Sequence, residues 1–169
     1  MFDESAVSER YFFPRTDPPE HAKPIQVDGA VLQCSHLPGT PTLLHFHGNG
    51  EVTRDWSDLQ RVMGQSGYGC LLAEYRGYGG STGAPQLVTM LDDALAIHDA
   101  IEGPVVVYGR SVGSIYALHV AANRPVAGLL LESGIADVHQ RLRMRFSPDE
   151  LDEHQTLLQS IEAAAPPTR

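Results

Sequence analysis

Short apolar runs alternate along the chain with longer segments in which apolar residues recur every three or four positions. The apolar runs occupy residues 42–46, 69–75, 105–108 and 126–131, and the periodic segments occupy residues 56–66, 87–101 and the stretch that ends at Asn123. Nearly continuous apolar runs are typical of strands buried on both faces of a parallel sheet, and the periodic segments are typical of amphipathic helices. The pattern therefore predicts an α/β fold in three layers, a mostly parallel sheet with helices on both faces.

The N-terminal part departs from this alternation. Residues 1–24 carry several prolines and charges, which predicts an irregular entry with Tyr11-Phe12-Phe13 as its packing anchor. The next run, residues 25–34, is interrupted by Asp28-Gly29, and this turn signal predicts a hairpin.

The C-terminal part carries a helix start signal. Ser147 supplies an N-cap, Pro148 occupies the first helical position, and Glu150 follows the cap by three residues. We therefore expect a helix from Pro148 to about Ala164.

The length and composition favour a single core. The chain has 169 residues and 42% hydrophobic content, enough to bury roughly two-thirds of the surface of the unfolded chain. We expect an N-terminal segment, residues 1–24, and one domain, residues 25–169. The core of that domain would span residues 25–137, and a C-terminal helical segment would span residues 138–165.

The charge argues against nucleic acid as a partner. The net charge is −9 and the isoelectric point is about 5.2, whereas nucleic-acid binding needs a clustered basic face. Arg141, Arg143 and Arg145 form the one basic cluster, which is too short to change this expectation.

The lack of a secretory signal at the N-terminus and the use of only two cysteines predict a cytoplasmic protein. Residues 1–4 begin an acidic, polar segment without the basic start and apolar core of a secretory signal. No apolar run approaches the ~20 residues that span a bilayer. Cys34 and Cys70 lie in strand-like segments and are expected to be buried thiols, not a disulfide.

One serine stands where a strand-like run meets a helical segment. The run at residues 105–107 leads into Gly109-Arg110-Ser111-Val112-Gly113, after which an apolar, alanine-rich segment begins. A serine on so tight a turn has strained backbone angles, and side chains at Gly109 and Gly113 would collide with the neighbouring strand and helix. This G-x-S-x-G pattern predicts that Ser111 is the nucleophile of an acyl-transfer reaction.

Acyl transfer also needs N–H donors for the oxyanion that develops on the attacked carbonyl. One is expected from Val112, which follows the nucleophile at a helix N-terminus, where the helix dipole favours negative charge. The second is expected from Asn49, with Gly50 less favoured, because residues 44–50 end a strand in a glycine turn. Both elements would lie at the carboxyl ends of neighbouring strands, where open α/β sheets bind their ligands.

Four motifs carry a resemblance to a known family. They are His45-Phe46-His47-Gly48-Asn49-Gly50, Glu74-Tyr75-Arg76-Gly77-Tyr78-Gly79-Gly80-Ser81-Thr82-Gly83, Gly109-Arg110-Ser111-Val112-Gly113 and Leu130-Leu131-Glu132-Ser133. In this order and spacing the chain resembles the α/β-hydrolase superfamily, and within it the BEM46-like serine hydrolases of the α/β-hydrolase domain 13 and 17 type. The resemblance implies hydrolysis of esters, thioesters or peptides by a Ser-Asp-His triad without a cofactor.

The chain departs from the family at two places. Glu74 stands where the family usually has aspartate, a small change in a loop that we expect to be structural. The catalytic aspartate and histidine of the family follow two further strands, whereas no strand-like run follows Leu131 here. The resemblance thus implies a fold that is shortened at its C-terminal end.

The acid and the base of a triad would therefore have to be other residues of this chain, at positions that differ from those of the family. The order in this fold is serine, acid, histidine, which leaves His119, His139 and His154 as bases, and His119 is set aside below because of its distance from Ser111. Glu132 and Asp137 end the last strand on the ligand-binding edge of the sheet, where an acid could orient a histidine. For all four residues a solvated or packing role is the alternative.

Other polar residues are expected to be structural. His119 lies eight residues along the helix from Ser111, about 12 Å away, too far to act on it. His45 and His47 are two positions apart on one strand and so face the same side, which could give two metal ligands, but no third ligand is evident. The polar residues of the 87–101 helix are expected to be solvated: Asp92, Asp93, His98 and Asp99.

Two functions remain open from the sequence. The first is a serine hydrolase in which Ser111 attacks a small acyl ester or thioester. The second is a catalytically impaired module that has lost its base and binds an acyl ligand or a protein partner. In that case residues 128–131 would form an edge strand, whose unpaired backbone groups favour a homodimer or a covering by residues 138–165.

Overall fold

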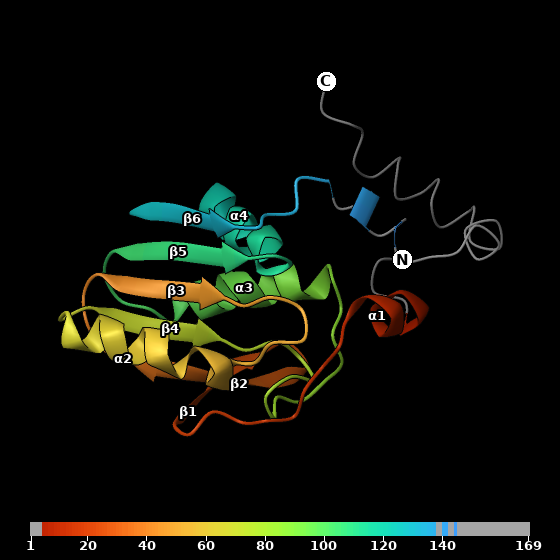
Figure 1. Cartoon of the computed structure of the whole chain (residues 1–169), viewed down its shortest axis with the longest axis horizontal. Coiled ribbons are helices and arrows are strands. Elements are labelled where there is room, and N and C mark those ends of the chain that lie inside the picture. Colours follow the sequence, from red (N-terminus) through yellow and green to blue (C-terminus); the bar gives the residue numbers. More distant parts are fainter. Residues whose placement is uncertain (1–4, 138–139, 142–143, 145–169) are drawn as a thin grey trace.

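The computed structural model describes residues 5–137, 140–141 and 144, and the chain folds around one six-stranded sheet (Figure 1). The strands are β1 (Ala22–Val27), β2 (Ala30–Leu37), β3 (Thr42–Phe46), β4 (Gly69–Ala73), β5 (Val105–Arg110) and β6 (Gly128–Glu132). The helices are α1 (Ser5–Tyr11), the 3-10 turn η1 (Thr53–Trp56), α2 (Ser57–Gln65), α3 (Thr89–Asp99) and α4 (Gly113–Asn123). The strand order is β1-β2-β4-β3-β5-β6.

The first two strands form the predicted hairpin. Val27 pairs with Ala30 in antiparallel register across the two-residue turn Asp28-Gly29, where Gly29 has a φ of +69°. A left-handed residue at this position suits the twist of a tight hairpin, which explains why glycine is used. β2 then pairs antiparallel with β4 and joins the hairpin to the rest of the sheet.

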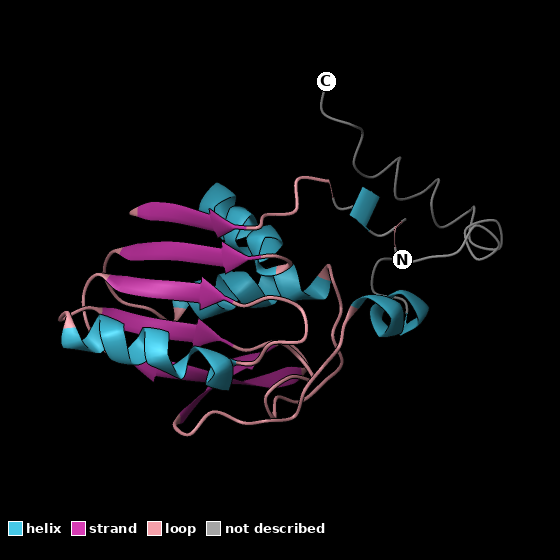
Figure 2. Ribbon diagram, viewed as in Figure 1, coloured by secondary structure: helices cyan, strands magenta, loops and turns pink. Residues whose placement is uncertain are grey.

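The other four strands of the sheet are parallel. β4, β3, β5 and β6 all run in one direction, so their carboxyl ends lie at the same edge of the sheet. α2 and η1 cover one face of the sheet, and α3 and α4 cover the other (Figure 2). This confirms the predicted three-layer α/β-hydrolase-type fold with its mostly parallel sheet.

Within the described residues, the sheet is buried at its centre and exposed along its last strand. β3 is buried at all five positions. β6 is the last strand of the described sheet, and its three leucines expose 37%, 54% and 45% of their surface. The run predicted at residues 126–131 therefore contains the outermost strand among the described residues.

The N-terminal segment is not irregular throughout, in contrast to the expectation from its sequence. Residues Ser5–Tyr11 form the short helix α1, which lies beyond the carboxyl ends of the strands (Figure 1). Tyr11 and Phe12 are each only 3% exposed and belong to the main core. Burial of these two rings stabilises a helix too short to form alone, which no local pattern could indicate. Tyr11-Phe12 thus serve as the predicted anchor, whereas Phe13 is half-exposed.

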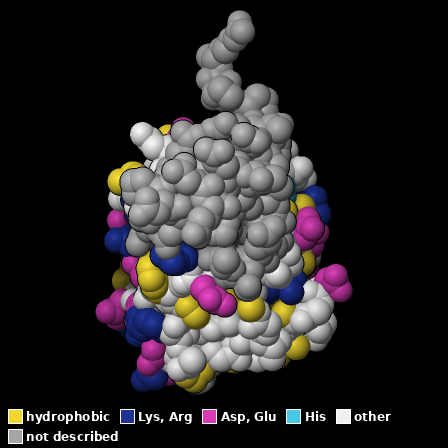
Figure 3. Space-filling model, turned by 90° about the vertical axis from the view of Figure 1, so that its right-hand side faces the viewer, with side chains coloured by type: hydrophobic (Ala, Val, Ile, Leu, Met, Phe, Trp, Pro, Cys, Tyr) yellow, Lys and Arg dark blue, Asp and Glu magenta, His cyan; other side chains and the backbone are white. Residues whose placement is uncertain are grey.

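Three further expectations concern composition. Cys34 and Cys70 are buried free thiols, and burial raises the pKa of each to about 12. Among the described residues, none of the helices combines the length and the apolar character that crossing a bilayer requires. Acidic and basic side chains are interspersed on the described part of the face in Figure 3.

The helix expected from Pro148 to Ala164 lies outside the described residues.

Candidate active site

Ser111 stands between the end of β5 and the start of α4. Its φ of 52° lies in the left-handed region, which costs a non-glycine residue about 1–2 kcal/mol. Hydrogen bonds on both sides hold this conformation. The Ser111 N–H donates to the Glu132 carbonyl at 2.9 Å, and the Ser111 carbonyl accepts from the N–H and Oγ of Ser114 at 3.0 and 2.6 Å. The chain therefore makes the sharp strand-to-helix turn of a nucleophile elbow, with a partly exposed serine at its apex.

The glycines on either side of Ser111 are required by close backbone contacts. A Cβ on Gly113 would lie 2.1 Å from the carbonyl oxygen of Phe46, and one on Gly109 would lie 2.6 Å from the carbonyl oxygen of Gly113. Real Cβ contacts are never this short, so any larger residue would push α4 away from β3 and β5. The elbow is thus built against the end of β3.

The loop after β3 leaves the sheet beside the elbow. Phe46 pairs with Gly109, so residues 47–49 and 110–112 continue from the same level of the two strands. The two predicted oxyanion donors belong to these segments. Neither the Val112 N–H nor the Asn49 N–H donates a hydrogen bond to another described residue.

His47 fixes the peptide that precedes the Asn49 N–H. Its side chain is fully buried, with Nδ1 2.8 Å from the Gly48 carbonyl oxygen and Nε2 2.7 Å from Oε1 of Glu74. Because a carbonyl oxygen only accepts, Nδ1 must donate to it. The other ring nitrogen, Nε2, forms a hydrogen bond with the carboxyl group of Glu74. In a planar trans peptide the C=O and the next N–H point in opposite directions. Holding the Gly48 oxygen toward His47 therefore directs the Asn49 N–H away from it.

Glu74 is the anchor of this arrangement. Its carboxylate is fully buried, and Oε2 accepts from both the N–H and the hydroxyl of Thr53 at 3.0 Å. The Tyr75 hydroxyl donates to the His47 carbonyl at 2.7 Å. The residue that departs from the family pattern is thus satisfied inside the core, in agreement with the structural role expected for it.

A second group of charged side chains links the loop after β3, the turn at Ser111 and β6. Glu51 accepts from the Gly48 N–H at 2.7 Å and from the Trp56 indole at 3.3 Å, and it pairs with Arg110. Arg110 also contacts Glu132 at 3.3 Å. Arg110 therefore ties the loop after β3 to the end of β6 directly beside Ser111.

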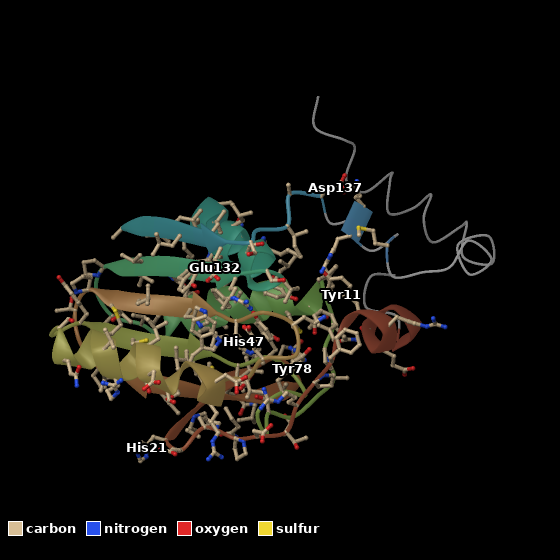
Figure 4. The ribbon with its side chains drawn as sticks, in the orientation of Figure 1. Tyr11, His21, His47, Tyr78, Glu132 and Asp137 are labelled. Atoms are coloured by element: carbon tan, nitrogen blue, oxygen red, sulfur yellow. The ribbon has the colours of Figure 1, made fainter. Side chains whose placement is uncertain are left out.

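The acid candidates are placed as follows. The Glu132 carboxylate accepts from the Tyr108 hydroxyl and from Arg110, and these two contacts lower its pKa. Burial, then Glu132, raises the pKa of Tyr108 to about 12. Asp137 is exposed and accepts from the Gln140 N–H at 2.8 Å. Figure 4 shows Glu132 at the end of β6 and Asp137 farther along the chain.

The histidines considered as the base are not placed beside Ser111 by the described residues. His139 and His154 lie outside the described residues, so their roles stay predictions. His119 lies on α4, where its carbonyl accepts from the Asn123 side-chain amide at 2.8 Å. No histidine among the described residues hydrogen-bonds to Glu132 or Asp137.

His45 and His47 do not share a metal site with other described residues. Among these residues, no three His, Cys, Asp or Glu side chains are grouped to hold an ion. The His45 ring packs on Trp56 and Tyr108, with centroids 4.1 and 4.6 Å apart. Burial, followed by the charges of His47 and Arg110, lowers the pKa of His45 to about 3. His45 is therefore a neutral packing residue.

Two polar residues of α3 were expected to be solvated and are buried instead. Asp93 is 4% exposed, and both of its oxygens accept from Arg76, at 2.6 and 2.7 Å. His98 is 8% exposed. The charged partner of Asp93 comes from the glycine-rich loop after β4, so the helix sequence alone could not reveal the pair. Buried carboxylates of this kind are tolerated only when such a partner satisfies them.

Two residues that shape the site carry no sequence signal of that role. Arg110 is the variable position of the elbow motif, and its side chain necessarily starts beside the nucleophile. Its pairing with Glu51, 59 positions away in the sequence, leaves no local trace. The hydroxyl of Tyr78 donates to Oδ1 of Asn49 at 2.9 Å, whereas the sequence pattern marks this tyrosine only as part of a glycine-rich loop.

Comparison with known sequences supports this geometry. The sequence profile of the alpha/beta hydrolase family matches residues 43–168. Lysophosphatidylserine lipase ABHD12 from Gallus gallus is 31% identical over 126 residues, which cover 67% of this chain and 32% of that protein. Protein bem46 from Schizosaccharomyces pombe is 30% identical over 118 residues, covering 64% of this chain and 40% of that protein. The chain thus spans less than half the length of these relatives.

Solved structures share the fold. Alpha/beta hydrolase domain-containing protein 10 from mouse superposes with a TM-score of 0.65 at 21% identity, over 80% of this chain and 58% of that one. The esterase EaEST from Exiguobacterium antarcticum superposes with a TM-score of 0.62 at 22% identity, over 84% and 56%. Together with the strand order and the elbow, the profile match establishes that this chain belongs to the alpha/beta hydrolase family, among its BEM46-like members.

Proposed function

We propose that this chain carries the nucleophile and the oxyanion hole of a serine hydrolase that cleaves a small acyl ester or thioester, with peptides as a further class. The observation that carries the proposal is Ser111, held at a left-handed φ of 52° directly before a helix and beside a glycine loop. The similarity to relatives named as lipases favours the same chemistry.

The reaction would proceed in two steps. The Ser111 hydroxyl attacks the carbonyl carbon while a base removes its proton, and the oxyanion accepts hydrogen bonds from the N–H groups of Val112 and Asn49. The alcohol or thiol leaves with a proton, and an acyl-enzyme remains. Water then attacks this ester and releases the acid. The residues of this chain considered for the base are His139 and His154, with Glu132 or Asp137 as the acid.

A fluorophosphonate tests the proposal by its mechanism. The reagent forms an Oγ–P bond and releases fluoride, and both events need an activated serine near oxyanion donors. Intact-mass analysis of the purified chain should show one adduct, which Ser111→Ala abolishes. Loss of the adduct in His139→Ala or His154→Ala would identify the base.

Ser133 supplies a matched control. It is also a serine with a left-handed φ, 50°, and it also follows a parallel strand at the ligand-binding edge. A loop follows Ser133 where a helix follows Ser111. Ser133→Ala should therefore keep the adduct. An unlabelled wild-type chain would refute the serine hydrolase and favour the alternative, a module that binds an acyl ligand or a protein.

Self-association through β6 belongs to the same set of proposals. Leu129, Leu130 and Leu131 are exposed on the last strand of the described sheet, and edge strands offer unpaired backbone groups. A homodimer should appear in sedimentation experiments and dissociate in a Leu130→Lys variant. A monomer at all concentrations would contradict this part of the proposal.

A further inference from the structure

The oxyanion loop of the proposed function, residues 47–52 after β3, is held by the N-terminal segment as well as by the sheet. Oδ1 of Asn49 accepts from the Phe13 N–H at 3.0 Å, and Nδ2 of Asn49 donates to the Tyr11 carbonyl. The Asn49 side chain therefore bonds the backbone of residues 11–13 through both of its polar atoms. We call residues 11–17 the N-terminal strap.

Further contacts fasten the strap on both sides of Asn49. The Tyr78 hydroxyl donates to Oδ1 of Asn49 at 2.9 Å and accepts from the Phe13 N–H at 3.0 Å. The backbone carbonyl of Arg15 accepts a hydrogen bond from the Gly79 N–H at 2.8 Å. The guanidinium group of Arg15 donates to the Asp55 carboxylate at 2.6 Å. The strap thus crosses two loops that follow different strands. Tyr11 and Tyr78 lie on the same side of the molecule as α1, beyond the strand ends (Figure 4).

The buried part of the strap gives these contacts a fixed reference. Tyr11 and Phe12 are 3% exposed, and their rings pack edge to face with centroids 5.1 Å apart. Tyr78 is fully buried. The Asn49 side chain is therefore bonded to backbone atoms and a hydroxyl that cannot move without opening the core.

These contacts complete the orientation of one peptide. His47 holds the Gly48 carbonyl oxygen, which fixes one side of the peptide between Gly48 and Asn49. The strap holds the Cα side of Asn49 through its side chain. A planar peptide held at both ends has no freedom to rotate its N–H. Residue 49 thus combines a backbone donor with a side chain that aims this donor.

We propose that the Asn49 side chain is a positioning residue, and that the N-terminal strap is the element through which it directs the Asn49 N–H at the oxyanion. The inference rests on the proposed function for its catalytic consequence, but the anchoring of the loop can be measured separately. The sequence motif supplies the asparagine, and the strap supplies the groups that it bonds.

The test measures phosphonylation of Ser111 in the full chain as a function of fluorophosphonate concentration. Asn49→Ala removes both side-chain contacts and keeps the backbone N–H. We expect the maximal rate to fall at least ~10-fold with little change in the half-saturating concentration, since a misdirected donor weakens transition-state binding alone. Tyr78→Phe removes one hydrogen bond at Asn49 and should give a smaller decrease. Asn123→Ala is the matched control, because the Asn123 side-chain amide hydrogen-bonds to His119 on the same helix, α4, and not to the loop.

Amide hydrogen exchange reports on the loop whether or not the serine reacts. In Asn49→Ala the hydrogen-bonded loop amides of Glu51 and Val52 should exchange at least ~10-fold faster, while those of β3 and β5 keep their protection. If the wild-type chain takes no label, the proposed function fails and exchange alone decides the role of the strap. Unchanged exchange in the loop, or an equal acceleration throughout the sheet, would overturn the proposal. So would a wild-type phosphonylation rate in Asn49→Ala.

Discussion

Strands β3 and β6 lie on the two sides of β5, are both five residues long and both read as apolar runs. β3 is buried at every position, whereas β6 has no buried position. The difference continues into the loops that follow. After β3, the backbone of Gly48 and the side chains of Asn49 and Glu51 are all hydrogen-bonded. After β6, residues 133, 134, 136 and 137 are exposed.

This difference teaches where the chemistry of the site is preorganised. In the proposed reaction, the donor side on the inner strands is held by buried and half-buried contacts before any substrate arrives. The side beyond β6 contributes carboxylates that remain in contact with water, and Glu132 is engaged by Arg110 and Tyr108. Preorganised donors are the larger part of oxyanion stabilisation, so the buried side is the one whose disturbance should matter most.

The largest expected effect comes from filling the contact between the elbow and β3. Gly113→Ala places a Cβ 2.1 Å from the Phe46 carbonyl oxygen and should lower the free energy of unfolding by about 3 kcal/mol or more. Gly128→Ala on β6 is the control, because its nearest neighbour would be Val106 Cγ1 at 3.6 Å. Urea denaturation measures both. Similar losses in the two variants would show that the inner and outer strands do not differ as described.

A second comparison removes a leucine from each strand. Leu44 on β3 is fully buried, and Leu44→Ala should cost about 2–5 kcal/mol through lost contacts and a cavity. Leu130 on β6 is 54% exposed, and Leu130→Ala should change stability by less than about 0.5 kcal/mol. Thermal and urea unfolding of the monomeric protein distinguish the two. A large loss for Leu130→Ala would mean that β6 is covered in solution.

A third prediction concerns pH and the β3 residue His45. The pKa of His45 is about 3 in the folded protein and ordinarily about 6.5. The unfolded chain therefore binds a proton between these values and the folded protein does not, so stability is full above pH 6.5 and falls as pH falls toward 3. From pH 7 to 5 this contributes a loss of about 1–2 kcal/mol. His45→Phe should flatten that slope in urea unfolding, and parallel slopes for both proteins would reject the assignment.

The smallest effect separates the two carboxylates that contact Arg110. Glu51, in the loop after β3, also accepts from the Gly48 N–H and the Trp56 indole, and its side chain is 23% exposed. Glu51→Gln should cost about 1 kcal/mol because the charge-assisted bonds weaken. Glu132→Gln, at a side chain that is 48% exposed, should leave the melting temperature unchanged within error. Equal shifts in the two variants would show that Arg110 depends on both carboxylates alike.

Much of the fold follows from local patterns. The run at residues 42–46 is β3 itself, and Asp28-Gly29 forms the predicted hairpin turn. The predicted segment 56–66 corresponds to α2 with the preceding η1. Alternating strands and helices can be read locally because hydrophobic periodicity reflects burial of each element on its own neighbours. The glycines around Ser111 likewise indicate a tight turn, since only residues without a side chain fit on either side of its apex.

The burial of each element and the contact partners of its side chains could not be predicted from local patterns. β3 and β6 have the same apolar character, and only the strand order makes one central and the other the last strand of the described sheet. Asp93 and His98 look like solvated helix residues until the loop after β4 places Arg76 over Asp93. The helix α1 exists because Tyr11 and Phe12 enter a core formed by residues far away in the sequence.

By itself, therefore, the sequence determined the α/β class, the family and the serine at the elbow, because each depends on spacing within a short stretch of chain. The tertiary structure decided what holds the oxyanion loop, since His47 with Glu74, Glu51 with Arg110 and Asn49 with the strap join segments 27 to 59 positions apart. Hydrogen bonds and burial act between neighbours in space, and only folding makes these residues neighbours.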